Sequence, residues 1–229
     1  MNTLLLAAGF GTRLRPITES IPKCLVPING DPLLNIWLKS LNQISLKKIF
    51  LNTHYLSNQV HSYISSLNYD MDITIFHENI LLGTAGTIIN NIQSFLDEDL
   101  IVIHADNYCL TDLSLLIKAH RNRPSNCLMT MMTFHTSKPE DCGIVEVENN
   151  IVVKFHEKIK NPPGDLANCA VYVFSPELLN LINHKLNSIK DISIELIPQI
   201  LGKIFNYTIN DTFIDIGTIE TYELANKKK

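Results

Sequence analysis

Short aliphatic runs alternate with helix-like segments along the first half of this chain, and this alternation constrains the fold more than any other feature. Continuous aliphatic runs are typical of strands buried on both faces of a parallel sheet, and the segments between them carry apolar residues at helical spacing. The order strand, helix, strand, helix predicts a doubly wound, Rossmann-like α/β/α fold with three layers. We expect strands at 3–7, 47–52, 73–76 and 100–104, and helices at 32–44, 57–67 and 84–94.

The second half of the sequence is richer in strands and makes the predicted sheet mixed. Strands are expected at 129–135, 144–147, 151–155, 170–174 and near 213–215, and helices at 176–186 and 192–201. The chain has no internal repeat, and no linker marks a domain boundary. We therefore predict one domain over residues 1–229, with a first half of about residues 1–110 and a second half of about 111–225.

Charge and hydropathy narrow the range of partners. Charged residues make up 18% of the chain and the formal net charge is −4, which argues against nucleic acid or an anionic membrane surface as the main partner. No apolar run approaches the ~20 residues that a membrane span needs. The basic side chains are therefore expected to serve a small anionic ligand.

The five cysteines are scattered without a Cys-x-x-Cys pair, so we expect neither a structural zinc site nor a disulfide framework. Most are expected to be buried, reduced thiols. The N-terminal segment has no basic region, and its apolar run is too short for a signal peptide. These features predict a cytoplasmic protein.

A turn of small residues follows the first predicted strand. Gly9 and Gly11 let the backbone approach a ligand with its N–H groups directed at anionic oxygens, and Arg13, Arg15 and Lys23 add positive charge. This combination predicts a polyphosphate site; the plainer alternative is an ordinary tight turn with surface arginines. A dinucleotide-binding turn is excluded because Leu14 stands where a third glycine is needed, and the Gly-Lys-Ser/Thr of a P-loop is absent.

Two aspartates stand where predicted buried strands end. Asp106 follows the strand at 100–104, and Asp215 ends the last strand. Ligands of open parallel sheets bind beyond the carboxyl ends of the strands, so both side chains are expected at the same site as the turn. A hard divalent cation completed by phosphate oxygens and water would satisfy both carboxylates, although each aspartate alone is also compatible with a helix or turn cap.

The segment from Gly9 to Leu14, followed by Pro22 and Lys23, resembles the signature of nucleotidyltransferases that activate sugar 1-phosphates. The resemblance extends over nearly the whole chain and implies the GT-A-like fold of nucleotide-diphospho-sugar transferases, with Mg²⁺ bound by Asp106 and Asp215. In that family a glycine precedes the first aspartate, where this chain has Ala105.

The resemblance also implies roles for the remaining site residues. Catalysis is assigned to Arg13, Lys23 and Lys158. Nucleotide binding is assigned to Leu6, Ala7, Ala8, Gly9, Gly11, Thr12, Arg13, Glu78, Gly83 and Thr84. Binding of the sugar phosphate is assigned to Asp106, Gly143, Glu157, Lys158 and Asn168. Glu78 is expected to accept hydrogen bonds from the base, and Cys169 stands where relatives often carry glycine.

The expected activity is therefore nucleotidyl transfer from a nucleoside triphosphate, preferably GTP, to a sugar 1-phosphate of the mannose or heptose type, with release of pyrophosphate. A cytidylyltransferase for a phosphorylated small alcohol, amine or amino acid, and a uridylyltransferase for another sugar 1-phosphate, remain alternatives. A non-catalytic module that binds sugar nucleotides is a further alternative, but it would be expected to lack Lys23, Arg13 or a metal aspartate. The sequence is compatible with a homo-oligomer.

Overall fold

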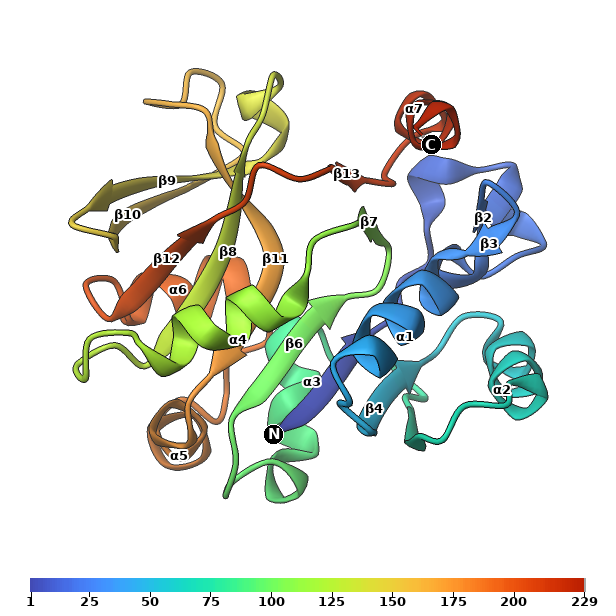
Figure 1. Ribbon diagram of the computed structural model, residues 1–229, viewed down its shortest axis with the longest axis horizontal. Helices are drawn as coiled ribbons and strands as arrows, with labels where there is room; N and C mark the ends of the chain where they lie inside the picture. Colours follow the sequence, from blue (N-terminus) through green and yellow to red (C-terminus); the bar gives the residue numbers. More distant parts are fainter. Residues whose placement is uncertain (229) are drawn as a thin grey trace. The chain divides into compact units, whose positions relative to one another are not determined.

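The computed structural model describes residues 1–228, which form two compact units (Figure 1). The first unit contains Asn2–Leu81, Ile103–Leu113 and the chain from Asp211 onward. The second unit contains Met1, Leu82–Val102 and Ser114–Asn210. Strand β6 (Leu100–His104) passes from the second unit to the first. The single-domain assignment with halves meeting near residue 110 stays a prediction.

Three parallel strands form the sheet of the first unit. Their bounds are β1 (Asn2–Leu6), β4 (Lys48–Thr53) and β5 (Asp72–His77). In register, Leu4 lies opposite Phe50, and Phe50 lies opposite Thr74. The short elements of this unit are η1 (Thr12–Leu14), η2 (Ile17–Glu19), η3 (Lys23–Leu25), β2 (Pro27–Ile28) and β3 (Asp31–Pro32). The strands predicted at 3–7, 47–52 and 73–76 are thus confirmed.

Helices α1 (Leu33–Gln43) and α2 (Ser57–Ser66) connect these strands, as the sequence predicts. The apolar residues of α1 recur on one face and are buried: Leu33, Leu34, Trp37, Leu38 and Leu41. The Trp37 indole is 1% exposed, and its Nε1–H donates to the Asn107 carbonyl oxygen at 2.9 Å. Because a buried indole N–H needs an acceptor, this bond fixes α1 against the segment that follows β6.

A two-stranded ladder completes the first unit. Strands β7 (Asn107–Cys109) and β13 (Phe213–Asp215) run antiparallel, and helix α7 (Ile219–Lys227) follows β13. An apolar cluster packs around this ladder and the turn that follows β1: Leu14, Val26, Ile28, Leu33, Tyr108, Ile214, Ile216 and Ala225. The cluster supports the turn from below with buried apolar side chains, although the turn itself lies at the surface.

The second unit contains the mixed part of the sheet, in the order β11-β8-β12-β10-β9. Strand β8 pairs in parallel with β12 and antiparallel with β11, so the prediction of a mixed sheet is confirmed. The strands are β8 (Met129–His135), β9 (Gly143–Glu148), β10 (Ile151–Glu157), β11 (Leu166–Phe174) and β12 (Ile204–Thr208). The helical elements are α3 (Thr84–Asn90), η4 (Ile92–Ser94), α4 (Leu113–Arg121), η5 (Pro139–Asp141), α5 (Pro176–Lys185), η6 (Ile192–Leu196) and α6 (Ile197–Gln199).

Two helices end earlier than the sequence predicts. The helix expected at 84–94 stops at Asn90, because the Asn91 amide donates to the Thr87 carbonyl and the chain tightens into the 3₁₀ segment η4. The helix expected at 192–201 is a π-helical turn followed by one short α-helical turn. Pro198 lacks the N–H that a regular α-helix would use at that position.

No helix in the described residues has the length and apolar character that a membrane crossing requires.

A buried histidine links two elements of the second unit and gives a prediction about pH. His120 is fully buried, with Nδ1 2.8 Å from Thr130 Oγ1 and Nε2 3.4 Å from Asp99 Oδ1. The hydrogen bond from His120 lowers the pKa of the Asp99 carboxyl, and this effect exceeds the opposing effect of burial. A depressed folded-state pKa stabilises the fold above the ordinary pKa of aspartate, and this stabilisation is lost as the pH falls through the lowered value.

We therefore expect Asp99→Asn to lower the Tm by about 2–4 °C near pH 6, which corresponds to about one hydrogen bond. The difference from the wild-type protein should shrink as the pH falls below about 4. Thermal unfolding at pH steps from about 6 to about 3.5 measures it. Asp97→Asn, at an exposed position nearby, is the control and should change the Tm little. A difference that stays constant down to the lowest pH would contradict this assignment.

Candidate active site

The turn after β1 presents unused backbone donors. Gly11 has φ +64°, and a Cβ there would lie 2.9 Å from Thr18 Cγ2, so only glycine fits. The Thr18 hydroxyl donates to the Gly11 carbonyl at 2.7 Å and closes the turn. A Cβ at Gly9 would meet nothing within 4 Å. Within the described chain, the N–H groups of residues 9–12 donate to no protein acceptor. The turn therefore has open space and free donors for an anion.

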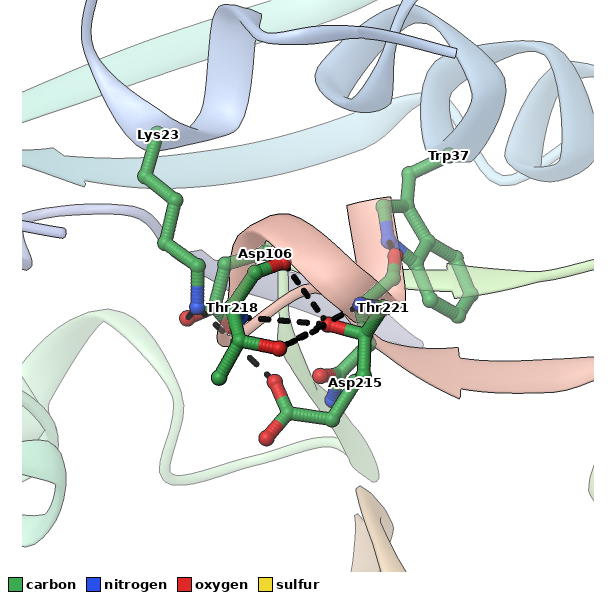
Figure 2. Close-up of polar contacts among 7 residues, drawn as sticks. Lys23, Trp37, Asp106, Asp215, Thr218 and Thr221 are labelled. Carbon is green, nitrogen blue, oxygen red and sulfur yellow. Dashed lines mark hydrogen bonds and ion pairs between the residues drawn. The ribbon is translucent and has the colours of Figure 1, made fainter. Parts of the chain in front are cut away.

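A buried lysine joins two carboxylates beside this turn. Lys23 is 8% exposed, and its Nζ lies 2.6 Å from Asp106 Oδ2 and 3.8 Å from Asp215 Oδ1. Figure 2 shows the Lys23 side chain extending toward both aspartates. The β7–β13 ladder explains their proximity, since Asn107 lies opposite Asp215 and Asp106 directly precedes β7. The structure thus brings together three of the residues that sequence analysis assigns to one site.

The electrostatics of this cluster favour an ionised Asp106. Burial raises the pKa of its carboxyl, but the charge of Lys23, the proximity of His104 and the Lys23 hydrogen bond outweigh burial and hold the pKa below its ordinary value. Its side chain is 34% exposed and that of Asp215 is 53% exposed. Both carboxylates thus remain accessible to a ligand while they share one cation.

Arg13 reaches the same cluster. A Cβ added to Gly217 would lie 3.2 Å from Arg13 Nη2 and 3.2 Å from Asp215 Oδ2, so the missing side chain of Gly217 leaves room for both groups. Gly217 precedes Thr218, which accepts a hydrogen bond from the Thr221 N–H and caps α7 (Figure 2). No role is predicted for Gly217 from the sequence alone.

Glu78 is tied to the turn through an asparagine that sequence analysis missed. The Ala7 N–H donates to Asn52 Oδ1 at 2.7 Å, and Asn52 Nδ2 donates to Glu78 Oε1 at 2.8 Å. Asn52 and Glu78 are 4% and 5% exposed. The signal in the sequence is an asparagine that directly follows the apolar run at residues 49–51 of strand β4. This network places the expected base acceptor in fixed relation to the turn.

Gly83 and Thr84 belong to the second unit. The polar groups at the start of α3 already have hydrogen-bond partners within the protein. The Ala85 and Gly86 N–H groups donate to the Lys190 carbonyl at 3.0 and 3.3 Å. Thr84 Oγ1 accepts from the Ile192 N–H at 2.8 Å. A Cβ on Gly83 would lie 2.4 Å from the Lys190 carbonyl oxygen. The glycine is therefore explained by packing, and its assignment to nucleotide binding stays a prediction.

Three of the residues predicted to bind the sugar phosphate lie on the β9–β10 hairpin or directly after it. Gly143 is opposite Glu157, and a Cβ on Gly143 would lie 2.7 Å from Glu157 Oε2 and 2.5 Å from the Phe155 ring. Lys158 has φ +49°, and its Nζ is 3.6 Å from Glu157 Oε1. Gly143, Glu157 and Lys158 thus form one group, in which the glycine makes space for the carboxylate.

Asn168 lies at an irregularity in β11. Its Oδ1 accepts from the Ala170 N–H at 2.9 Å, its Nδ2 donates to the Tyr172 hydroxyl at 2.7 Å, and Ala170 has φ +53°. Burial raises the pKa of Tyr172, which keeps the phenol neutral. Both ends of the Asn168 amide are engaged within β11, so its contact with a sugar stays a prediction.

A family model described as "Nucleotidyl transferase" matches residues 2–229. The chain is 26% identical over 231 residues to the D-glycero-alpha-D-manno-heptose 1-phosphate guanylyltransferase of Aneurinibacillus thermoaerophilus, covering 100% of this chain and 98% of that protein. It is 28% identical to the mannose-1-phosphate guanylyltransferase catalytic subunit beta of Dictyostelium discoideum, covering 95% of this chain and 61% of that protein.

The chain is also similar to a relative whose name specifies UTP as its nucleotide. The UTP–glucose-1-phosphate uridylyltransferase of a Synechocystis species is 28% identical over 241 residues, covering 97% of this chain and 61% of that protein. The chain spans about three fifths of the length of several curated relatives that it matches.

The fold is similar to that of HddC from Yersinia pseudotuberculosis, solved in complex with GMP-PN. The TM-score is 0.82 at 24% identity, covering 99% of this chain and 98% of that chain. This likeness confirms the predicted Rossmann-like α/β fold.

Proposed function

The chain belongs to the nucleotidyl transferase family, and from this we propose that it transfers a nucleotidyl group from a nucleoside triphosphate, preferably GTP, to a sugar 1-phosphate of the mannose or heptose type. The relatives named as mannose and heptose 1-phosphate guanylyltransferases support the substrate pair. The observation that carries the proposal is the position of Lys23 between Asp106 and Asp215, beside a turn with free N–H donors.

In the proposed reaction an oxygen of the sugar 1-phosphate attacks the α-phosphorus of the triphosphate. A new P–O bond forms, the bond to the β-phosphate breaks, and pyrophosphate leaves with the electron pair. A phosphate monoester has a second pKa of about 6, so the nucleophile is largely ionised at neutral pH and needs no general base. Catalysis then depends on alignment and on neutralisation of charge.

The residues of the first unit supply most of this neutralisation. The N–H groups of the turn would hold the triphosphate, while Arg13 and Lys23 would stabilise the departing pyrophosphate. Lys23 can serve this role because its ammonium already sits beside the carboxylates, largely excluded from water. Burial strengthens the interaction of this cation with a developing negative charge.

The donor set of Asp106 and Asp215 fits Mg²⁺. Two carboxylates that share one cation offer hard oxygen ligands, and Mg²⁺ usually binds one or two protein carboxylates, with substrate phosphates and water as the other ligands. The described residues contain no group of three or more His, Cys, Asp or Glu that could hold a metal ion. When bound, Mg²⁺ would supply charge neutralisation for the phosphates.

The second unit would bind the acceptor. Glu157 would accept hydrogen bonds from sugar hydroxyls, and the missing side chain of Gly143 leaves room for its carboxylate. Lys158, with a side chain 56% exposed, would meet the phosphate of the incoming sugar. A cytoplasmic location and a homo-oligomer stay predictions.

A pyrophosphate-release assay tests the function. The purified protein is offered GTP, UTP, CTP and ATP, each with mannose, heptose, glucose, N-acetylglucosamine or N-acetylmuramate 1-phosphate. We expect the largest kcat/KM with GTP and a manno-configured sugar 1-phosphate, and loss of activity when EDTA removes Mg²⁺. Release of pyrophosphate only with CTP and a non-sugar phosphate would contradict the proposal, as would undiminished release in EDTA.

A further inference from the structure

Asn52 uses both ends of its amide to join two segments of the first unit. Its Oδ1 accepts from the Ala7 N–H, where β1 leads into the glycine turn, and its Nδ2 donates to Glu78 Oε1 after β5. The side chain is 4% exposed and directly follows the apolar run at residues 49–51 of β4. A buried amide in such a position is costly unless both ends are bonded, and here they are.

The backbone around Glu78 is held as firmly as its side chain. The Glu78 N–H donates to the Thr53 carbonyl at 2.8 Å, and the Glu78 carbonyl accepts from His54 Nδ1 at 2.7 Å. The Asn52 amide then fixes the direction of the carboxylate. A carboxylate only accepts hydrogen bonds, so a ligand group that bonds to Glu78 must be a hydrogen-bond donor.

We propose that Asn52 is a positioning residue for base selection: it holds Glu78 so that the carboxylate meets a base with adjacent N–H donors, and it ties this acceptor to the glycine turn through Ala7. The inference rests on the proposed function and deepens it. Guanine presents a ring N–H next to an exocyclic amine. Uracil presents one N–H between two carbonyls, and adenine and cytosine place an unprotonated ring nitrogen beside their amine. A site built around a fixed acceptor therefore discriminates among these edges.

The test uses Asn52→Asp, which is nearly isosteric. The aspartate can still accept from the Ala7 N–H, but it cannot donate to Glu78 and places a second carboxylate against it. We expect the ratio of kcat/KM for GTP to that for UTP to fall at least about tenfold, the effect of losing a hydrogen bond to a charged group. The ratio of the Kd for GTP to the Kd for UTP, measured by calorimetry, should rise in parallel. Asn52→Ala, which adds no charge, is the second variant.

The Glu78→Gln background separates a positioning role from a structural one. In the double variant Asn52→Asp/Glu78→Gln, the amide introduced at position 78 can donate to the new carboxylate, so part of the lost thermal stability should return. If Asn52 acts through Glu78, Asn52→Asp should change the GTP to UTP ratio by less than about twofold in this background.

Asn206 provides a matched control in the second unit. It is 8% exposed on β12, accepts from Thr133 Oγ1 at 2.7 Å and donates to Thr208 Oγ1 at 2.9 Å. Asn206→Asp should lower the Tm and leave the GTP to UTP ratio unchanged.

Three results would overturn the inference. One is an Asn52→Asp protein that loses stability as Asn206→Asp does but keeps the wild-type ratio. Another is a change of equal size with and without Glu78, and the third is a wild-type protein that binds GTP and UTP equally. Failure of the proposed function is a separate outcome: the wild-type protein would bind GTP selectively but release no pyrophosphate with any acceptor, and the calorimetric ratio would still decide the role of Asn52.

Discussion

Lys23→Met is expected to lower kcat by about 10²–10³-fold, the usual effect of removing one preorganised group that stabilises transition-state charge. The methionine keeps much of the volume of the side chain but removes the cation 2.6 Å from Asp106 and 3.8 Å from Asp215. The departing pyrophosphate would then lose the buried positive charge that the proposed mechanism assigns to it. Steady-state pyrophosphate release with GTP and the preferred sugar 1-phosphate measures the loss, and circular dichroism checks that the fold is intact.

Lys39→Met is the matched control for this prediction. Lys39 also pairs with an aspartate, Asp31, at 2.7 Å, but its side chain is 55% exposed. A solvent-exposed ion pair contributes about 0–1 kcal/mol, so turnover should be unchanged and stability nearly so. Equal loss of turnover in the two variants, or near-normal turnover in Lys23→Met, would remove Lys23 from the catalytic machinery.

Gly83→Ala should produce the largest loss of stability among single-methyl additions in the second unit. Gly83 has φ +82° and ψ 169°, a region that is almost exclusive to glycine, and its Cβ would lie 2.4 Å from the Lys190 carbonyl oxygen. Backbone strain costs about 1–3 kcal/mol and overpacking a similar amount, so the free energy of unfolding should fall by about 2–5 kcal/mol. Urea denaturation with a linear extrapolation measures it.

Gly164→Ala serves as the comparison, because a Cβ there meets nothing within 4 Å. Its free energy of unfolding should differ from that of the wild-type protein by less than about 0.5 kcal/mol. If Gly83→Ala were as stable as Gly164→Ala, the contact between the start of α3 and Lys190 would not be the reason for glycine at this position.

Much of the first unit could be predicted from the sequence because its signals are local. The apolar run of β1 lies close to the glycines of the turn, Asp106 comes shortly after the apolar strand β6, and Asp215 ends β13. The role of Asn52 could not be predicted in this way, because it depends on pairing of β4 with strands on both sides. Those pairings bring Ala7 and Glu78 to the same asparagine.

Two glycines of the second unit show that the local sequence does not reveal which groups lie beside a residue in the fold. Gly83 and Gly143 read as ligand-facing positions in the sequence, yet the groups that exclude a side chain there are the Lys190 carbonyl and the Phe155 ring with Glu157. These neighbours are distant in sequence or on a paired strand, so no local pattern indicates them. The break near Pro198 was not predicted, since the helix expected at 192–201 runs through this proline, although a proline lacks the N–H that regular helical bonding uses.

The ladder between β7 and β13 has a consequence for how the protein is made. Lys23 and Asp106 leave the ribosome well before Asp215, which lies on the strand that pairs with β7. Until β13 pairs with β7, the emerging polypeptide lacks one of the two carboxylates that flank Lys23. If the proposed function holds, a nascent chain would therefore remain catalytically silent until β13 has been synthesised and has paired with β7.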